Sequence, residues 1–166
     1  MKKIILFISA LSALSVFFIT GCGKKDTREP VEMSINIYLV APEGSDLGGK
    51  TIGCNDILVP VSKTVLVEKN AVESALAELL AMKSSKELIN YIKGPGLFLY
   101  QATISNGIAE VYLKGDFAIS TACDIPRIRE QLFETAKQFA EIKEVKIYIN
   151  ARSLEAYLSL AQQGFN

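Results

Sequence analysis

The chain has 166 residues, and its 18 Lys and Arg side chains balance its 18 Asp and Glu side chains. This balance gives no reason to expect a nucleic-acid partner, which would favour a basic surface. His and Trp are absent, and the missing His removes the commonest general base and the commonest metal ligand. Ser, Lys and Asp also form no recognisable hydrolase signature, so we expect no enzyme, no cofactor and no metal centre. The alternative is an envelope hydrolase with a Ser–Lys pair, whose two residues can be distant in sequence.

The N-terminus has the pattern of a bacterial lipoprotein signal. Lys2 and Lys3 precede an apolar run over residues 4–19, which leads into Thr20-Gly21-Cys22. A charged start, a short apolar stretch and small residues before a cysteine direct export and cleavage. We predict that residues 1–21 are removed and that Cys22 carries the lipid, which anchors an exported protein to the extracytoplasmic or periplasmic face of a membrane. The alternative is an uncleaved membrane helix, for which the run is slightly short.

Residues 22–32 are predicted to form a polar tether behind the lipid. The ten residues 23–32, at about 3.5 Å each, would hold the domain within roughly 35 Å of the bilayer. Removal of residues 1–21 takes away two lysines and no acid, so the mature net charge is (18 − 2) − 18 = −2. The remaining 166 − 21 = 145 residues suffice for one domain with a core.

Two cysteines, Cys54 and Cys123, remain when Cys22 is lipidated. An even number of cysteines in an oxidising envelope indicates one disulfide. The alternative is two separate buried thiols.

The first half of the domain shows two strands followed by helices. Residues 33–40 and 57–67 are rich in β-branched side chains, and Pro60 restricts part of the second strand to an edge or a bulge. Asn70 with Glu73 predicts a helix start, and Ser84 with Glu87 predicts a second, short helix. The apolar stripe of the first helix comprises Val72, Ala75, Leu76, Leu79 and Leu80.

Asn106-Gly107 predicts a tight hairpin turn, because both residues tolerate positive φ. Counting outward pairs Ile104 with Ala109, Ala102 with Val111 and Tyr100 with Leu113 as an apolar face. The opposite face collects Gln101, Thr103, Glu110 and Tyr112.

The last third begins with a long helix that Asp124 is predicted to cap. A final strand over residues 143–150 and a short helix from Ser153 follow. The order β-β-α-α-β-β-α-β predicts an α+β domain over residues 33–150, with one small sheet and helices on one of its faces. Residues 151–166 form a C-terminal extension.

The segment Gly44 to Thr51 matches the phosphate-loop pattern G-x-x-x-x-G-K-[ST]. A phosphate loop needs a helix that begins at its Lys-Thr end, and the sequence after Thr51 favours a strand instead. We therefore expect no nucleotide. Four acidic side chains occupy positions typical of turns and caps, so a structural role is favoured over a shared cation; they are Asp46, Asp56, Asp116 and Asp124.

Aromatic side chains divide into two sets by their position along the strands and helices. The predicted core set is Tyr38, Phe98, Tyr100 and Phe139. Tyr112 and Tyr148 fall on outward faces and are the candidates for a partner surface.

Residues 34–150 resemble the GerMN domain of sporulation, spore-germination and other envelope lipoproteins. The resemblance rests on the two first strands, the first helix, the run 106–113 and the pattern Gln131…Thr135…Gln138-Phe139…Val145-Lys146-Ile147. The chain departs from the family at Lys63, where an Arg is common, and at Tyr112-Leu113-Lys114, where Asp-Leu-Ser is frequent.

The resemblance implies a non-enzymatic binding or assembly module, related in fold to ring-building domains of envelope-spanning complexes. It also implies that Cys54 and Cys123 match the pair of a cysteine-containing branch. Our first hypothesis is therefore a membrane-anchored interaction module with an envelope protein partner or self-assembly. The alternative is a receptor for a small ligand or a cell-wall glycan near Tyr112, Tyr148 and the loop 44–49.

Overall fold

The computed structural model describes residues 29–165. The predicted signal peptide 1–21, the lipidation site Cys22 and the tether up to residue 28 lie outside the described residues. None of the helices formed by residues 29–165 is long and apolar enough to cross a membrane. In chain order the elements are β1 (Val31–Ala41), β2 (Lys50–Thr51), a 3-10 turn (Gly53–Asn55), β3 (Ile57–Val67), α1 (Ala71–Ala81), β4 (Phe98–Ser105), β5 (Ile108–Lys114), α2 (Asp124–Lys137), β6 (Glu144–Ile149), β7 (Arg152–Ser153) and α3 (Leu154–Gln163).

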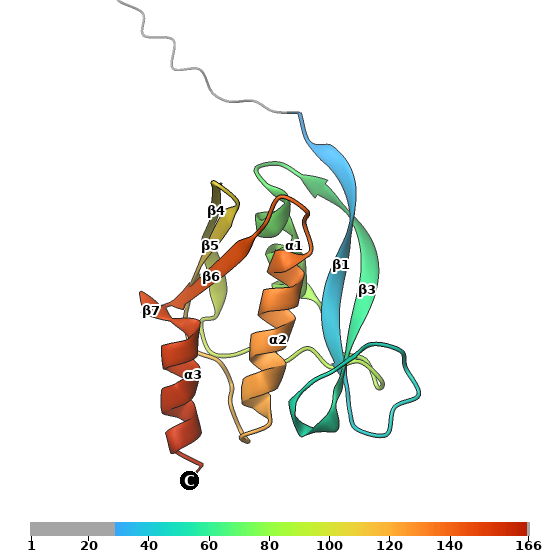
Figure 1. Cartoon of the computed structure of the whole chain (residues 1–166), viewed down its shortest axis with the longest axis vertical. Coiled ribbons are helices and arrows are strands. Elements are labelled where there is room, and N and C mark those ends of the chain that lie inside the picture. The colour runs from blue at the N-terminus through green and yellow to red at the C-terminus, as the bar shows by residue number, and fades with distance from the viewer. Residues whose placement is uncertain (1–28, 166) are drawn as a thin grey trace, which may run out of the picture.

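Helices α1 and α2 lie between two small sheets (Figure 1). Both helices contact β1 on one side; on the other side α1 contacts β4 and α2 contacts β6. The α+β class is confirmed, but the single sheet suggested by the sequence is two sheets, with strand orders β1-β3-β2 and β4-β5-β6-β7. The division arises because α1 and α2 bury apolar side chains toward both sheets and so separate the strands of the first half from those of the second.

Strands β1 and β3 pair antiparallel from Val31↔Val67 to Ala41↔Ile57. Side chains of β1 alternate, and Ile35, Ile37 and Leu39 are buried against the helices. The short β2 pairs only with Ile57 and Leu58, so Pro60 lies in the part of β3 that has one neighbour. The expected edge position of this proline is therefore correct, since a proline there leaves no ladder bond unmade.

Polar side chains of α2 and of the residue after it take the place of a further strand beside β1. The Gln138 amide accepts a hydrogen bond from the Asn36 N–H (2.7 Å) and donates one to the Asn36 C=O (2.8 Å). Thr135 Oγ1 accepts from the Tyr38 N–H (3.4 Å), and Gln131 Nε2 donates to the Tyr38 C=O (2.8 Å). These bonds satisfy backbone groups that an edge strand would otherwise leave unpaired.

The hairpin of β4 and β5 forms around Asn106 and Gly107, whose φ angles are 53° and 79°. The pairs Ile104↔Ala109 and Ala102↔Val111 agree with the prediction, but a bulge between Leu99 and Gln101 brings Leu99 opposite Leu113. The extra residue is Tyr100, which is consequently 60% exposed. The expectation that Tyr100 and Phe98 belong to the core is wrong, because the bulge reverses the alternation of the strand.

The short helix expected from Ser84 does not form in residues 82–92. Instead Ile89 pairs with Val40 in an isolated bridge, and the buried Asn90 side chain donates to the carbonyls of Leu79 and Met82 at the end of α1. The Ser85 hydroxyl accepts from the Leu88 N–H. Some backbone groups of the segment thus bond to β1 and α2, and others bond within the segment in a non-helical pattern. A helix this short would have little stability of its own.

Helix α3 begins at Ser153 as predicted, and the Ser153 hydroxyl accepts a hydrogen bond from the Ala156 N–H. Leu154 and Leu158 are buried in the same core cluster as Leu132 of α2. The C-terminal helix therefore packs onto the domain, beside α2 and β6.

Candidate interaction surface

Tyr112 of β5 and Tyr148 of β6 stand side by side on the sheet face that points away from the helices. The two residues are register partners in the parallel pair β5–β6. Their rings stack with centroids 5.1 Å apart and planes 12° from parallel. Both side chains are half-buried. The outward orientation expected from the sequence is confirmed, and the parallel register places the two rings in contact.

Strand alternation explains this placement. Val111, Leu113, Ile147 and Ile149 are buried toward the helices, so Tyr112 and Tyr148 between them must face outward. The Tyr112 hydroxyl donates a hydrogen bond to Glu110 Oε2 (3.2 Å). Burial and this bond both raise the pKa of Tyr112, so it remains a neutral hydrogen-bonding group at neutral pH.

A cavity of about 300 Å³ adjoins Tyr148. Its lining is mostly apolar and comes from α2, β6, β7 and the start of α3: Phe133, Val145, Lys146, Ile147, Tyr148, Ser153, Leu154 and Glu155. Strand β7 pairs with Tyr148 and Ile149. Among residues 29–165 no second strand pairs with β6 over residues 144–147, and the cavity lies beside this part of β6. No local pattern in the sequence indicates this cavity, because it depends on how α3 folds back against α2.

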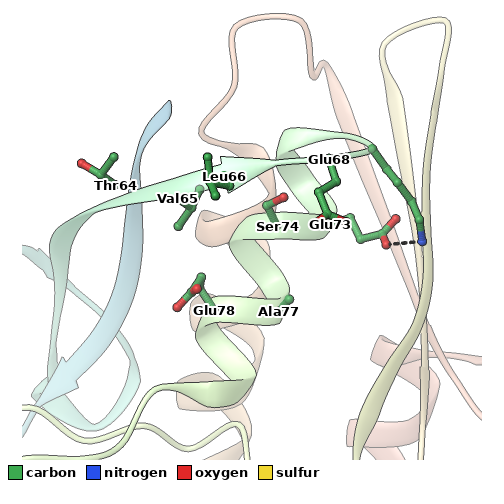
Figure 2. A pocket seen from close by; sticks show the side chains of 9 residues that line it. Thr64, Val65, Leu66, Glu68, Glu73, Ser74, Ala77 and Glu78 are labelled. Atoms are coloured by element: carbon green, nitrogen blue, oxygen red, sulfur yellow. Dashed lines mark hydrogen bonds and ion pairs between the residues drawn. The ribbon is translucent and has the colours of Figure 1, made fainter. Parts of the chain in front are cut away.

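A second, open groove of about 520 Å³ lies between the end of β3 and α1 (Figure 2). It contains Ser74 and Lys69, which raises the possibility of a Ser–Lys catalytic pair. Lys69 Nζ is 2.9 Å from Glu73 Oε1, and this hydrogen bond raises the pKa of Lys69. Lys69 thus pairs with Glu73 in its charged form, whereas a lysine that acts as a base needs a lowered pKa.

Cys54 and Cys123 form a disulfide in the structure (S–S 2.02 Å, Cα–Cα 5.9 Å). The bridge joins the turn before β3 to the start of α2. Cys54 is exposed and adopts a positive φ of 63°. The loop after β1 is therefore fastened to α2 at this point.

The acidic residues next to the two cysteines form an ion cluster with Arg127. Arg127 Nε lies 2.5 Å from Asp56 Oδ2, and Nη1 lies 3.2 Å from Asp124 Oδ1. Asp56 Oδ1 accepts from the Glu43 N–H (3.2 Å), and the Arg127 guanidinium stands over the Tyr91 ring, 4.7 Å from its centroid. Asp56 and Asp124 thus have structural partners for both of their carboxylate oxygens.

The sequence suggested that Asp124 caps its own helix, but its side chain has other partners. Its Oδ2 accepts from the backbone N–H groups of Ser120 and Thr121, in the turn before α2. Burial would raise the pKa of Asp124, but these two bonds and Arg127 outweigh it and lower the pKa.

Asp116 instead accepts from the Tyr157 hydroxyl (3.2 Å), and Asp46 lies exposed in the loop, so the four acids do not converge. Within residues 29–165 no group of three His, Cys, Asp or Glu side chains could hold a metal ion.

The phosphate-loop-like segment has another structure. Lys50 and Thr51 form the strand β2 where a phosphate loop would begin a helix. Lys50 Nζ binds the carboxylates of Glu130 (2.8 Å) and Glu134 (2.6 Å) on α2. Hydrogen bonds to these two acids raise the pKa of Lys50.

The α+β sandwich described above is the fold of GerMN domains. The model of the Germane family, described as "Sporulation and spore germination", matches residues 36–155, and the chain belongs to this family. The resemblance inferred from the sequence is thereby confirmed. No curated protein matches the chain.

Two solved structures illustrate the fold. The tandem GerMN domains of the sporulation protein GerM from Bacillus subtilis match with a TM-score of 0.54 and 17% identity, over 74% of this chain and 40% of theirs. The first GerMN domain of the same protein matches with a TM-score of 0.52 and 18% identity, over 74% of this chain and 86% of that one. This chain thus spans less than half of the tandem structure.

Proposed function

We propose that this chain is an exported lipoprotein, anchored through a lipid on Cys22, whose GerMN domain is a non-enzymatic interaction or assembly module. Its setting would be a complex of the cell envelope, of the sporulation type or related to it. Membership of the Germane family and the sporulation role in the name of GerM support this setting. The observation that carries the proposal is the outward tyrosine pair beside the apolar cavity at the open edge of β6.

This surface suits a protein partner for two reasons. Tyrosines offer a large apolar area with a polar tip and few rotatable bonds, which makes them frequent interface anchors. Over residues 144–147, where β7 does not pair with β6, the backbone N–H and C=O groups at this edge of β6 could pair with an added strand. A partner segment laid along β6 would contact Tyr148 and fill the cavity.

Photocrosslinking in living cells tests the proposal. A photoreactive amino acid replaces Tyr148 in one variant and Tyr100 in the matched control, because Tyr100 is an exposed tyrosine on the same sheet but lies at the bulge of β4. We expect a discrete adduct with an envelope protein, or with a second copy, from position 148 and none from position 100. Equal adducts from both positions, or none from position 148, would contradict the assignment of the surface.

A small ligand or a cell-wall glycan is the second candidate for the same surface. The observation in its favour is the cavity next to the Tyr148 ring, whose volume of about 300 Å³ is at the lower end for ligand pockets. A thermal shift with purified muropeptides that disappears in Tyr148→Ala would support this candidate over a protein partner.

A further inference from the structure

Apolar side chains are exposed at the end of the β1–β3 ribbon where the chain enters the domain. Val31 is 60% exposed and Leu66 is 61% exposed, and Met33 is also exposed. They lie in the last three pairs of the ribbon, Val31↔Val67, Glu32↔Leu66 and Met33↔Val65. Val31 and Met33 share one face and Leu66 occupies the other. We call Val31, Met33 and Leu66 the ribbon tip.

The ribbon tip is exposed because the ribbon is longer than the helices that cover it. Ile35, Ile37 and Leu39 are buried against α1 and α2, whereas the first residues of β1 extend beyond these helices (Figure 1). The tip therefore contributes little to the core. Val31 and Met33 continue the core-facing side of the ribbon beyond the helices, and Leu66 adds an exposed apolar side chain to its opposite side.

The chain outside the described residues indicates which occupant this is. Cys22 precedes Val31 by 31 − 22 = 9 positions, a separation that can span at most about 32 Å. Other exposed apolar side chains, such as Leu160 and Phe165, belong to the C-terminal helix and the residues after it, at the opposite end of the domain from the chain entry (Figure 1). If Cys22 carries a lipid, the ribbon tip is the apolar surface held nearest to the bilayer.

We propose that the ribbon tip is a membrane-contact surface whose partner is the interface of the bilayer that holds the Cys22 lipid. This inference rests on the lipid anchor of the proposed function. Val31, Met33 and Leu66 would enter the interface while the ribbon backbone stays at the headgroup level, because an open strand edge cannot enter the hydrocarbon.

The charged residues next to the ribbon tip indicate how the tip would contact the membrane. Glu32 and Glu68 are exposed next to the tip, together with Lys69, so the local charge is mixed and gives no attraction to anionic lipids. Contact would come from apolar insertion, and it would add a second attachment point to the lipid. Two attachment points would restrict the orientation of the domain at the membrane.

The absence of Trp from the chain allows a direct test with a single introduced fluorophore. Leu66→Trp reports on the tip, and Leu160→Trp is the matched control, since Leu160 is also an exposed leucine (50%, against 61% for Leu66) and lies on α3. The full lipidated protein is reconstituted in phosphatidylcholine vesicles with and without brominated acyl chains. We expect a blue-shifted emission and quenching by bromine for Leu66→Trp, and neither for Leu160→Trp. Addition of anionic lipid should not increase the quenching.

Three outcomes would overturn the inference. Equal quenching of the two variants, with Cys22 lipidation verified by mass, would refute the membrane contact and leave the anchor intact. A blue shift of Leu66→Trp that follows protein concentration without vesicles would assign the tip to a second copy. An unlipidated Cys22 would refute the anchor itself. Val31→Trp repeats the measurement from the other face of the ribbon if Leu66→Trp disturbs folding.

Discussion

The substitution Gln131→Leu is expected to destabilise the domain, although it places an apolar side chain of similar size at a fully buried position. Gln131 is 0% exposed. Its Nε2 donates to the Tyr38 C=O (2.8 Å), and its Oε1 accepts from the Tyr91 N–H (2.8 Å). Leucine would leave both backbone groups without these partners, one on β1 and one in the segment after α1.

The size of the effect follows from those two groups. A buried backbone group that loses its partner costs about 1–3 kcal/mol, so two groups give about 2–6 kcal/mol. Tyr38 and Tyr91 are half-buried, which lets water replace part of the loss, and we expect about 2–4 kcal/mol. This is a large share of the 5–15 kcal/mol by which domains are typically stable.

Urea unfolding followed by far-ultraviolet circular dichroism measures this change. The control is Gln101→Leu, an exposed glutamine on β4, which should alter the free energy of unfolding by less than about 0.5 kcal/mol. If Gln131→Leu also stays within about 0.5 kcal/mol of the wild type, the strand-replacing role of α2 is refuted.

Two further predictions concern the disulfide and the ion cluster that link the loop after β1 to α2. The double change Cys54→Ser and Cys123→Ser removes a covalent link between positions 69 apart. The loop-entropy model predicts that the free energy of unfolding falls by about 4 kcal/mol, which calorimetry would detect as a lower unfolding midpoint. An unchanged midpoint would contradict this prediction. The pKa of Asp124 is lowered in the folded state, so its contribution is present above the unfolded value of about 3.9 and is lost as the pH falls through the folded value. Asp124→Asn should therefore be less stable than the wild type at neutral pH and lose less stability on acidification, as chemical unfolding at several pH values would show.

Features that depend on neighbouring residues could be predicted from the sequence. The Asn106-Gly107 turn, the helix start at Asn70 and the helix start at Ser153 all form, because each depends on backbone preferences and side-chain caps within a few positions. The bulge at Tyr100 could not be predicted, because the alternation of apolar and polar residues in β4 is equally compatible with a regular strand.

Features that depend on distant segments were missed. The polar side chains of Gln131, Thr135 and Gln138 are spaced at positions i, i+4 and i+7, on the buried side of α2. This polar stripe was available as a signal, since buried polar groups need partners. Its partners on β1 lie 93 to 102 positions away, and no local pattern identifies them. The division into two sheets has the same cause.

The candidate site was predicted in part. Strand parity places Tyr112 and Tyr148 outward, but their contact requires the parallel register of β5 and β6. The cavity beside Tyr148 requires α3, which the sequence analysis assigned to an extension. Asp56, Asp116 and Asp124 have structural partners, as expected, whereas Asp46 is exposed in its loop. The ion cluster around Arg127 was not anticipated, because it joins residues 71 positions apart.

The central claim is that the outward face around Tyr112 and Tyr148 holds a partner of an anchored module. A photoreactive residue at Lys146, on the same strand and beside the cavity, provides a readout that leaves both tyrosines free to be changed. In cells, Tyr112→Ala with Tyr148→Ala should reduce the adduct from position 146 by roughly tenfold or more, as expected for the loss of interface anchors worth about 2 kcal/mol. The Tyr100→Ala control should leave the adduct unchanged. An undiminished adduct in a folded double variant would contradict the claim.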